Sequence, residues 1–197
     1  MSDTSPTKAR LRESHLARRA DRREVEQERQ ARGFRDQVLG LPELAAARRI
    51  AAFVSQDGEP GTRPLLDALH ARGVEVLLPV LLDDFDLDWG PYEPGEQEHG
   101  RFGLLVPTTP HVGVDAISAV SVVVCPGVAV DRAGHRLGRG GGSYDRALKR
   151  CGPEVLRAQL AYDEEVVDAV PAEEHDEPVD VIITPTTTIR TRRGRTR

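Results

Sequence analysis

The sequence predicts a single-domain α/β protein with an open, largely parallel β-sheet. Apolar runs of strand length alternate with stretches of helical periodicity along most of the 197 residues. Residues 121–125 form the clearest strand, because a continuous β-branched run is typical of a strand covered on both faces. A glycine-rich segment follows it directly. Because ligands of such sheets bind beyond the carboxyl ends of the strands, this segment is the first place to expect a site.

The N-terminal region predicts one long amphipathic helix over residues 7–39. Arg, Glu, Gln and Ala dominate it, and a thin apolar stripe recurs at helical intervals, formed by Leu11, Leu16, Ala20, Val25 and Phe34. Gly40 and Pro42 are expected to end this helix. A short further helix is expected as far as Arg48.

The next part of the chain predicts strand, helix and strand in turn. Residues 50–55 and 74–79 are apolar enough for strands. The helix between them is expected over residues 62–72, with Thr62 as its N-cap and Gly73 as its end. This alternation favours parallel pairing of successive strands.

The second half is less regular at first. Residues 83–110 place aromatic residues among prolines and acids, and predict an irregular excursion with short strands. Beyond the strand at 121–125, we expect a helix over 143–150, strands near 158–162 and 179–184, and a short helix over 163–170. No internal repeat is visible.

Composition argues against several classes of protein. No apolar run approaches the roughly 18 residues of a membrane-spanning helix. The N-terminus lacks the apolar stretch of a secretory signal, so we expect a cytoplasmic protein. Cys125 and Cys151 are the two cysteines and show no C-x-x-C spacing, which argues against a disulfide framework and a zinc site.

Charge is distributed unevenly along the chain, whose formal net charge is −5. Residues 190–197 hold five Arg and no acid. Such a tail could contact nucleic acid or an anionic surface, but without aromatic residues the simpler interpretation is a solvated, disordered end. We therefore expect one domain over residues 1–189, a disordered tail over 190–197, and no nucleic-acid partner.

The segment after residue 125 predicts a phosphate-binding loop. Five glycines fall within nine residues: Gly134, Gly138, Gly140, Gly141 and Gly142. Glycines at this density let successive backbone N–H groups converge on an anion, and the N-terminus of the following helix adds a partial positive charge. Arg136 and Arg139 add planar guanidinium groups suited to phosphate oxygens.

Asp145 stands where its carboxylate would repel such phosphates. A Mg²⁺ ion that bridges carboxylate and phosphate would remove this conflict. The alternative is that Asp145 only complements the dipole of the helix N-terminus, an effect of about 0.3–1 kcal/mol. Beside five glycines and two arginines, the metal is the better interpretation.

The loop is neither a Walker loop nor a dinucleotide fingerprint. Two blocks, PGVAVD at 126–131 and GHRLGRGGGSYD at 134–145, closely resemble the signature of the 5-formyltetrahydrofolate cyclo-ligase family, also called 5,10-methenyltetrahydrofolate synthetase. The resemblance extends to KARLR at 8–12, EPGT at 59–62 and PAEEHD at 171–176. It implies a three-layer α/β/α fold, Rossmann-like and similar to that of sugar-phosphate isomerases and CoA transferases.

The resemblance also implies roles for individual residues. ATP contacts are implied for Lys8, Arg12, Arg136, Leu137, Gly138, Arg139, Gly140, Gly141, Gly142, Ser143 and Tyr144. Folate contacts are implied for Val54, Glu59, Phe102, Arg139, Gly140, Gly141, Gly142 and Ser143. Arg139 and Tyr144 are implied as catalytic residues, and Asp145 and Asp176 as Mg²⁺ ligands. Without the resemblance, Lys8, Arg12, Glu59 and Asp176 are better interpreted as solvated charges, and Phe102 is equally well a core residue.

The reaction that the resemblance implies converts 5-formyltetrahydrofolate to 5,10-methenyltetrahydrofolate with ATP and Mg²⁺, and releases ADP and phosphate. The formyl oxygen attacks the γ-phosphate, N10 adds to the activated carbon, and phosphate departs. Such chemistry needs positioning and charge neutralisation rather than a nucleophilic side chain. We therefore expect a monomeric enzyme with ATP and the formylated folate as its small-molecule substrates.

Two positions depart from the family's pattern. Ser143 stands where many members have a second tyrosine, and Val106 stands where bacterial members often have Glu before Pro. Two alternatives stay open: an enzyme of the same fold with another substrate, for example a sugar-phosphate isomerase, and a paralogue that binds nucleotide or folate as a regulator. Independence from ATP would favour the first, and activity restored by Ser143→Tyr would favour the second.

Overall fold

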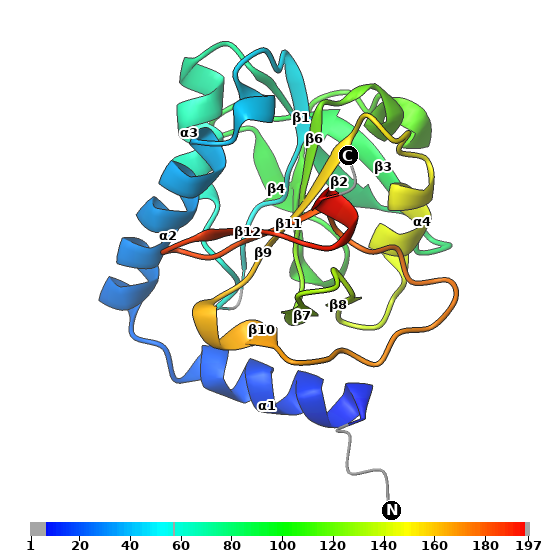
Figure 1. Cartoon of the computed structure of the whole chain (residues 1–197). Coiled ribbons are helices and arrows are strands. Elements are labelled where there is room, and N and C mark those ends of the chain that lie inside the picture. The colour runs from blue at the N-terminus through cyan, green and yellow to red at the C-terminus, as the bar shows by residue number, and fades with distance from the viewer. Residues whose placement is uncertain (1–6, 57, 196–197) are drawn as a thin grey trace, which may run out of the picture.

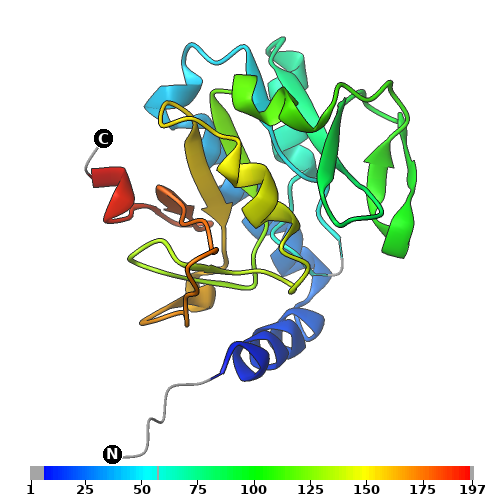
Figure 2. The same cartoon turned by 90° about the vertical axis from the view of Figure 1, so that its right-hand side faces the viewer.

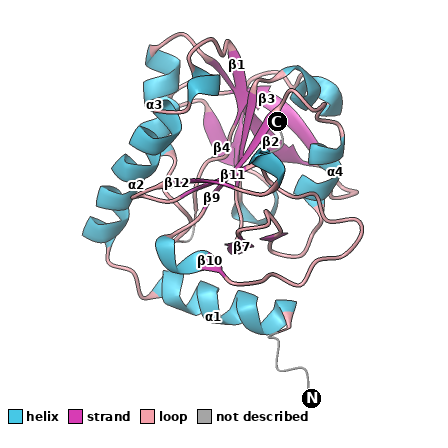
Figure 3. Cartoon of the chain, in the orientation of Figure 1, coloured by secondary structure: helices cyan, strands magenta, loops and turns pink. Residues whose placement is uncertain are grey.

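The main sheet has the open, largely parallel form that the sequence predicts. The computed structural model describes residues 7–56 and 58–195 (Figures 1 and 3). Within these ranges, the main sheet has seven strands in the order β12-β11-β9-β6-β1-β2-β3. Their bounds are β1 Arg49–Ala51, β2 Glu75–Leu81, β3 Leu87–Pro91, β6 Val122–Cys125, β9 Leu156–Leu160, β11 Val181–Ile183 and β12 Thr188–Arg190. The central strands from β2 to β11 run parallel, and β3 and β12 pair antiparallel at the two edges.

Helices cover both faces of this sheet (Figure 1). One layer contains α2 (Glu24–Leu39) and α3 (Arg63–Ala71), and the other contains α4 (Ser143–Lys149) and the 3₁₀ helix η3 (Val114–Ala119). Successive strand residues point to opposite faces, so Val122 packs with the α2 and α3 layer and Val123 with the α4 layer. Burial on both faces explains why β6 is apolar throughout. The predicted three-layer α/β/α architecture is confirmed.

Smaller pieces surround the sheet. The helix α1 (Lys8–Ala20) lies at the bottom of Figure 1 beside a small sheet of β7 (Ala129–Asp131), β8 (Arg136–Leu137) and β10 (Val166–Val167). The hairpin of β4 (Gln97–His99) and β5 (Leu105–Pro107) projects on the right of Figure 2. Four 3₁₀ turns complete the described chain: η1 Pro42–Leu44, η2 Arg101–Gly103, η4 Asp163–Glu165 and η5 Arg193–Arg195. None of the helices in these ranges is both long and apolar enough to cross a membrane.

The prediction of one helix over residues 7–39 is wrong, because this region forms two helices. α1 ends at Ala20 and α2 begins at Glu24. The break follows from Arg19, whose buried guanidinium donates to both carboxylate oxygens of Glu165 and to the Gly127 carbonyl. These bonds fix the end of α1 against residues far along the chain, and helical periodicity carries no sign of such a contact.

Other helical predictions are too long. The helix expected as far as Arg48 is only the turn η1, and the helix expected over 163–170 is only the turn η4. In the second case the chain becomes extended because Val166 and Val167 pair with β7. Thr62 does precede α3, but its hydroxyl accepts the N–H of Ser55 instead of capping the helix.

Residues 190–195 belong to the fold, in contrast to the disorder expected for this tail. Arg190 ends the edge strand β12 and forms an ion pair with Glu43 at 2.6 Å. Arg193 pairs with the fully buried Asp180 at 3.0 Å. Residues 196–197, and residues 1–6 of the predicted domain, lie outside the described ranges. Two of the basic groups that suggested a nucleic-acid contact are therefore paired within the chain.

Gly33 in α2 allows a close approach that alanine would prevent. A Cβ at this position would lie 2.5 Å from the carbonyl oxygen of Pro185. Gly33→Ala is therefore expected to destabilise the protein by about 1–3 kcal/mol, although alanine in an open helix gains about 1 kcal/mol over glycine. Urea denaturation measures the change, with Arg32→Ala on the exposed face of α2 as the control. Stabilisation by Gly33→Ala would contradict the close contact.

Candidate active site

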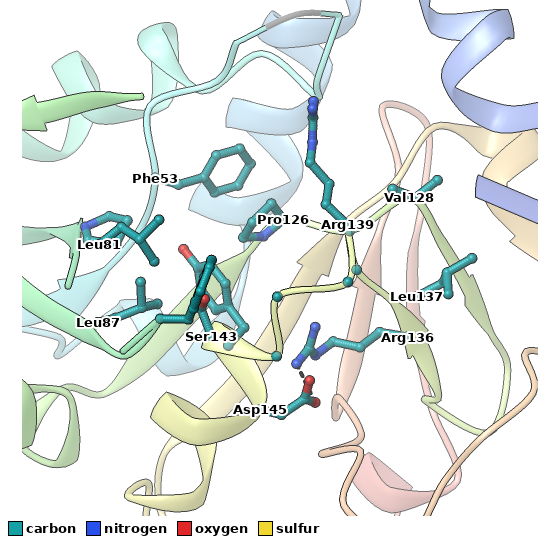
Figure 4. Close-up of a pocket in the computed structure, with 18 of the residues that line it drawn as sticks. Phe53, Leu81, Leu87, Pro126, Val128, Arg136, Leu137, Arg139, Ser143 and Asp145 are labelled. Carbon is teal, nitrogen blue, oxygen red and sulfur yellow. Dashed lines mark hydrogen bonds and ion pairs between the residues drawn. The ribbon is translucent and has the colours of Figure 1, made fainter. Parts of the chain in front are cut away.

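A cavity of about 490 Å³ opens beyond the carboxyl ends of β1 and β6 (Figure 4). The segments after these strands, the glycine-rich loop, α1 and the loops of the β3 to β5 region build its wall. All residues that the resemblance assigns line this one cavity: Lys8, Arg12, Val54, Glu59, Phe102, Arg136, Leu137, Gly138, Arg139, Gly140, Gly141, Gly142, Ser143, Tyr144, Asp145 and Asp176. The fold thus brings them together, and their roles toward individual ligands stay predictions.

The glycine-rich loop turns sharply between β8 and α4. Gly140 and Gly142 have φ values of +109° and +68°, in the left-handed region that residues with a Cβ rarely adopt. Arg12 reaches over from α1 and donates from Nε to the carbonyl of Gly138 at 2.8 Å. The loop therefore combines a compact run of backbone with a guanidinium group, an arrangement that suits an anion.

Arg136 and Asp145 form an ion pair beside the loop (Figure 4). Arg136 Nη2 lies 2.6 Å from Asp145 Oδ1, and Arg136 is only 6% exposed. The same carboxylate oxygen accepts the N–H of Glu177 at 3.0 Å. The sequence suggested that Asp145 needs a nearby cation to coexist with phosphates, and the structure places a guanidinium there.

A second charged cluster joins α1 to the segment before β11. Lys8 Nζ lies 2.8 Å from Asp176 Oδ2 and 3.0 Å from Glu173 Oε2. Burial by itself would raise the pKa of Asp176, but the hydrogen bonds from Lys8 and from the backbone N–H of Glu173 hold that pKa below its usual value. The carboxylate of Asp176 is therefore ionised at neutral pH.

The residues of this cluster fit a magnesium ion. Within the described ranges, the group of side chains that could hold a metal is Glu173, His175 and Asp176, whose ligand atoms lie within 4.8 Å of one another. Carboxylate oxygens are the ligands that Mg²⁺ prefers, and the ammonium group of Lys8 shows that the position attracts a cation. Asp145 lines the same cavity but does not belong to this group. Glu173 and His175 were not predicted, and their only sequence signal is their position in the PAEEHD block.

Glu59 and Arg139 contact each other at the cavity. Arg139 Nη2 lies 3.4 Å from Glu59 Oε1, and Glu59 Oε2 accepts the N–H of Gln56 at 3.2 Å. Figure 4 shows Arg139 pointing away from Asp145. The glycine-rich loop therefore sends one arginine toward the predicted metal ligand Asp145 and another toward the predicted folate ligand Glu59.

The wall of the cavity on the side of the main sheet is apolar, and its residues were not predicted as part of the site. Phe53, Leu81, Leu87 and Pro126 line it (Figure 4). Their position in the chain is the signal that could have found them: Phe53 and Pro126 follow β1 and β6, Leu81 ends β2, and Leu87 begins the antiparallel β3. An apolar wall opposite a cationic loop suits a ligand with a flat ring and an anionic part.

Two exposed phenylalanines lie at the rim of the cavity. Phe85 and Phe102 have φ values of +65° and +53°, and their rings stack with centroids 6.4 Å apart. Left-handed backbone at residues other than glycine is uncommon and is concentrated at functional sites. Phe102 was assigned from the resemblance. Phe85 was missed, because only the folding of two separate loops places it beside Phe102.

The residues at which the chain departs from the family's pattern differ in their relation to the cavity. Ser143 lines it at the start of α4, whereas Val106 is buried in β5 and does not line it. The neighbouring hydroxyl of Tyr144 is buried without a hydrogen-bond partner in the described ranges, and burial raises its pKa well above the usual value. Tyr144 is therefore a neutral donor at physiological pH.

Comparisons with known proteins point to a single family. The model of the 5-formyltetrahydrofolate cyclo-ligase family matches residues 4–185. A 5-formyltetrahydrofolate cyclo-ligase of Mycolicibacterium smegmatis is 36% identical over 184 residues, which cover 91% of this chain and 94% of the relative. One of Escherichia coli is 34% identical and covers 75% and 84%. The solved structure of Aquifex aeolicus 5,10-methenyltetrahydrofolate synthetase superposes with a TM-score of 0.80 at 30% identity, over 94% and 93% of the two chains.

Proposed function

Because the chain belongs to the 5-formyltetrahydrofolate cyclo-ligase family, we propose that it converts 5-formyltetrahydrofolate to 5,10-methenyltetrahydrofolate with consumption of ATP. The observation that supports this most directly is the shared cavity, in which a cationic glycine-rich loop lies opposite an apolar wall. A triphosphate suits the loop, and a pteridine ring suits the wall. Glu59 adds a carboxylate that can accept hydrogen bonds from N–H groups of such a ring.

The positive side chains of the cavity would bind and orient the nucleotide. Lys8, Arg12, Arg136 and Arg139 come from α1 and from the glycine-rich loop, so they approach the same ligand from two directions. Phosphoryl transfer asks the protein mainly to position the reactants and to neutralise charge, and these four groups can do both. The proposed reaction therefore needs no nucleophilic side chain of the protein.

The proposed reaction has two steps. The formyl oxygen attacks the γ-phosphorus, the bond to the leaving ADP breaks, and the oxygen becomes a phosphate ester. The lone pair of N10 then adds to the formyl carbon, the C–O bond breaks with release of phosphate, and the N10 proton is lost. The apolar wall formed by residues such as Phe53 and Leu81 would exclude water from the phosphorylated intermediate.

Asp176, together with Glu173, would hold the Mg²⁺ ion that accompanies ATP, because their carboxylates form the donor group that fits it. A magnesium ion bound there would neutralise part of the charge of the phosphates. Asp145 is proposed as a further ligand and, through its ion pair, holds Arg136 at the glycine-rich loop. Lys8 contacts Asp176 directly, so the metal and nucleotide sites are adjacent.

The proposal is tested by turnover. Purified protein with 5-formyltetrahydrofolate, ATP and Mg²⁺ is expected to develop the absorbance of the methenyl product and to release an equal amount of ADP. Omission of ATP is the control, since an isomerase of the same fold would not depend on it. Binding without turnover, with turnover gained in Ser143→Tyr, would identify a regulator instead.

The expected monomeric state and cytoplasmic location stay predictions, which gel filtration and cell fractionation test.

A further inference from the structure

The loop between β1 and α3 presents Glu59 to the cavity. Its base is closed by two reciprocal hydrogen bonds, in which Ser55 N–H donates to Thr62 Oγ1 at 2.9 Å and Thr62 N–H donates to Ser55 Oγ at 3.0 Å. Near its tip, Gly58 has a φ of +73°, and Glu59 N–H donates to the Gln56 carbonyl at 2.8 Å. The base of the loop is thus fixed by its own residues, whereas its tip turns through the left-handed conformation of Gly58, which glycine adopts without strain.

Tyr162 holds this tip from inside the protein. Its hydroxyl lies 3.1 Å from the carbonyl oxygen of Glu59 and 3.2 Å from that of Gly58, so its single proton is shared between the two. Burial raises the pKa of Tyr162 to about 12, against the opposite effect of Arg22 and Arg19. The hydroxyl is therefore a donor over the whole physiological pH range.

Tyr162 is itself held rigidly. It is 1% exposed, and the Arg22 guanidinium carbon lies 3.7 Å from the centre of its ring. Phe34 packs against the ring edge-on at 5.6 Å between centroids. The backbone N–H of Tyr162 donates to Glu165 Oε2 at 3.0 Å, and Glu165 forms the buried ion pair with Arg19.

Tyr162 does not line the cavity, so its effect on a ligand must pass through another residue. The carbonyl oxygen of Glu59 that accepts this hydrogen bond is two covalent bonds from the Cα of Glu59, which bears the side chain that faces the cavity. We propose that Tyr162 is a positioning residue, which fixes the Glu59 carboxylate in the place where the pteridine ring of the folate is recognised. This inference rests on the proposed function and extends it to a residue outside the cavity.

Tyr162→Phe removes the hydroxyl and leaves the ring packing in place. The folate must then order the loop tip when it binds, so its KM is expected to rise about threefold to tenfold, the equivalent of one net hydrogen bond. The values of kcat and of KM for ATP are expected to change less than the KM for folate, because Tyr162 acts on the glycine-rich loop only indirectly, through the contact between Glu59 and Arg139. Steady-state kinetics with each substrate varied in turn measures this separation.

Tyr92→Phe is the matched control. Tyr92 is also buried, and its hydroxyl donates to Asp67 at 2.7 Å, outside the cavity lining. Loss of this bond is expected to lower stability by a similar amount and to leave the KM for folate unchanged. Equal KM values for folate in Tyr162→Phe, Tyr92→Phe and the wild type would overturn the inference.

A double-mutant cycle separates positioning of Glu59 from a general weakening of the site. Glu59→Gln is expected to raise the KM for folate, and Tyr162→Phe should add little to it, because its effect passes through the same carboxylate. Full additivity would contradict the inference.

Hydrogen exchange supplies a readout without substrate: the Glu59 amide should exchange faster in Tyr162→Phe than in Tyr92→Phe. If the wild-type protein showed no turnover, that result would count against the proposed function alone. The exchange experiment would still test whether Tyr162 holds the loop that carries Glu59.

Discussion

Asp145→Asn is expected to lower kcat/KM for cyclisation by about 100-fold to 1,000-fold, the effect typical of losing one preorganised electrostatic contact in a transition state. The amide keeps the shape of the side chain but removes its charge. Arg136, which is 6% exposed, then loses its counter-charge, and the proposed metal loses one ligand. Initial rates measured against ATP and Mg²⁺ concentrations should show that higher magnesium restores only part of the activity.

Asp86→Asn is the matched control for this variant. Asp86 pairs with Arg150 at 2.5 Å beyond the last turn of α4, and it does not line the cavity. The control also breaks an Asp–Arg pair next to α4, so it reports the loss due to disturbance of this helix. A reduction of less than about tenfold in kcat/KM is expected, below the loss of one preorganised contact. If Asp145→Asn and Asp86→Asn reduced kcat/KM equally, or if Asp145→Asn kept wild-type turnover, Asp145 would have no special part in the reaction.

Arg19→Met is expected to produce the largest loss of stability, about 3–5 kcal/mol, because it leaves one half of a buried ion pair without its partner. The side chains of Arg19 and Glu165 are each 2% exposed, with Arg19 Nε 2.6 Å from Glu165 Oε1. The Gly127 carbonyl loses its donor as well. In a chain of this size the melting temperature should fall by about 6–20 °C, as thermal and urea denaturation can measure.

Two further variants define what the Arg19 result means. Arg35→Met breaks the pair between Arg35 and Asp36 at the surface, and is expected to change stability by less than about 0.5 kcal/mol. The double variant Arg19→Met/Glu165→Met is expected to regain part of the loss, because it removes the unpaired carboxylate together with its partner. A loss in Arg19→Met no greater than in Arg35→Met would show that the buried pair is not what holds α1 in place.

The strands and the glycine-rich loop could be predicted because their causes lie within a few neighbouring residues. A run such as 122–125 can be apolar throughout only where helices cover both faces, and five glycines between a strand and a helix permit backbone turns that other residues resist. The same local character made the signature recognisable. The fold class and the place of the candidate site therefore follow from neighbouring residues alone.

Helix ends were predicted poorly wherever a distant residue determines them. The break after Ala20 depends on Glu165, and the end of the helix expected at 163–170 depends on pairing of Val166 with β7. Apolar spacing describes which face of a helix is buried, but it contains no information about a buried guanidinium that meets a carboxylate 146 residues later. The same holds for the tail, where Arg193 finds the buried Asp180.

By itself, the sequence determined the fold class, the glycine-rich loop between a strand and a helix, and the family signature, since each depends on consecutive residues. Only the tertiary structure decided that Lys8 lies on Asp176, that Arg139 reaches Glu59, and that Tyr162 holds the loop from behind. Two of these contacts join segments that are more than a hundred residues apart in the sequence. The contact between Arg139 and Glu59 joins two different loops at the same edge of the sheet. Their geometry depends on how the helices pack against the sheet, and local sequence does not encode that packing.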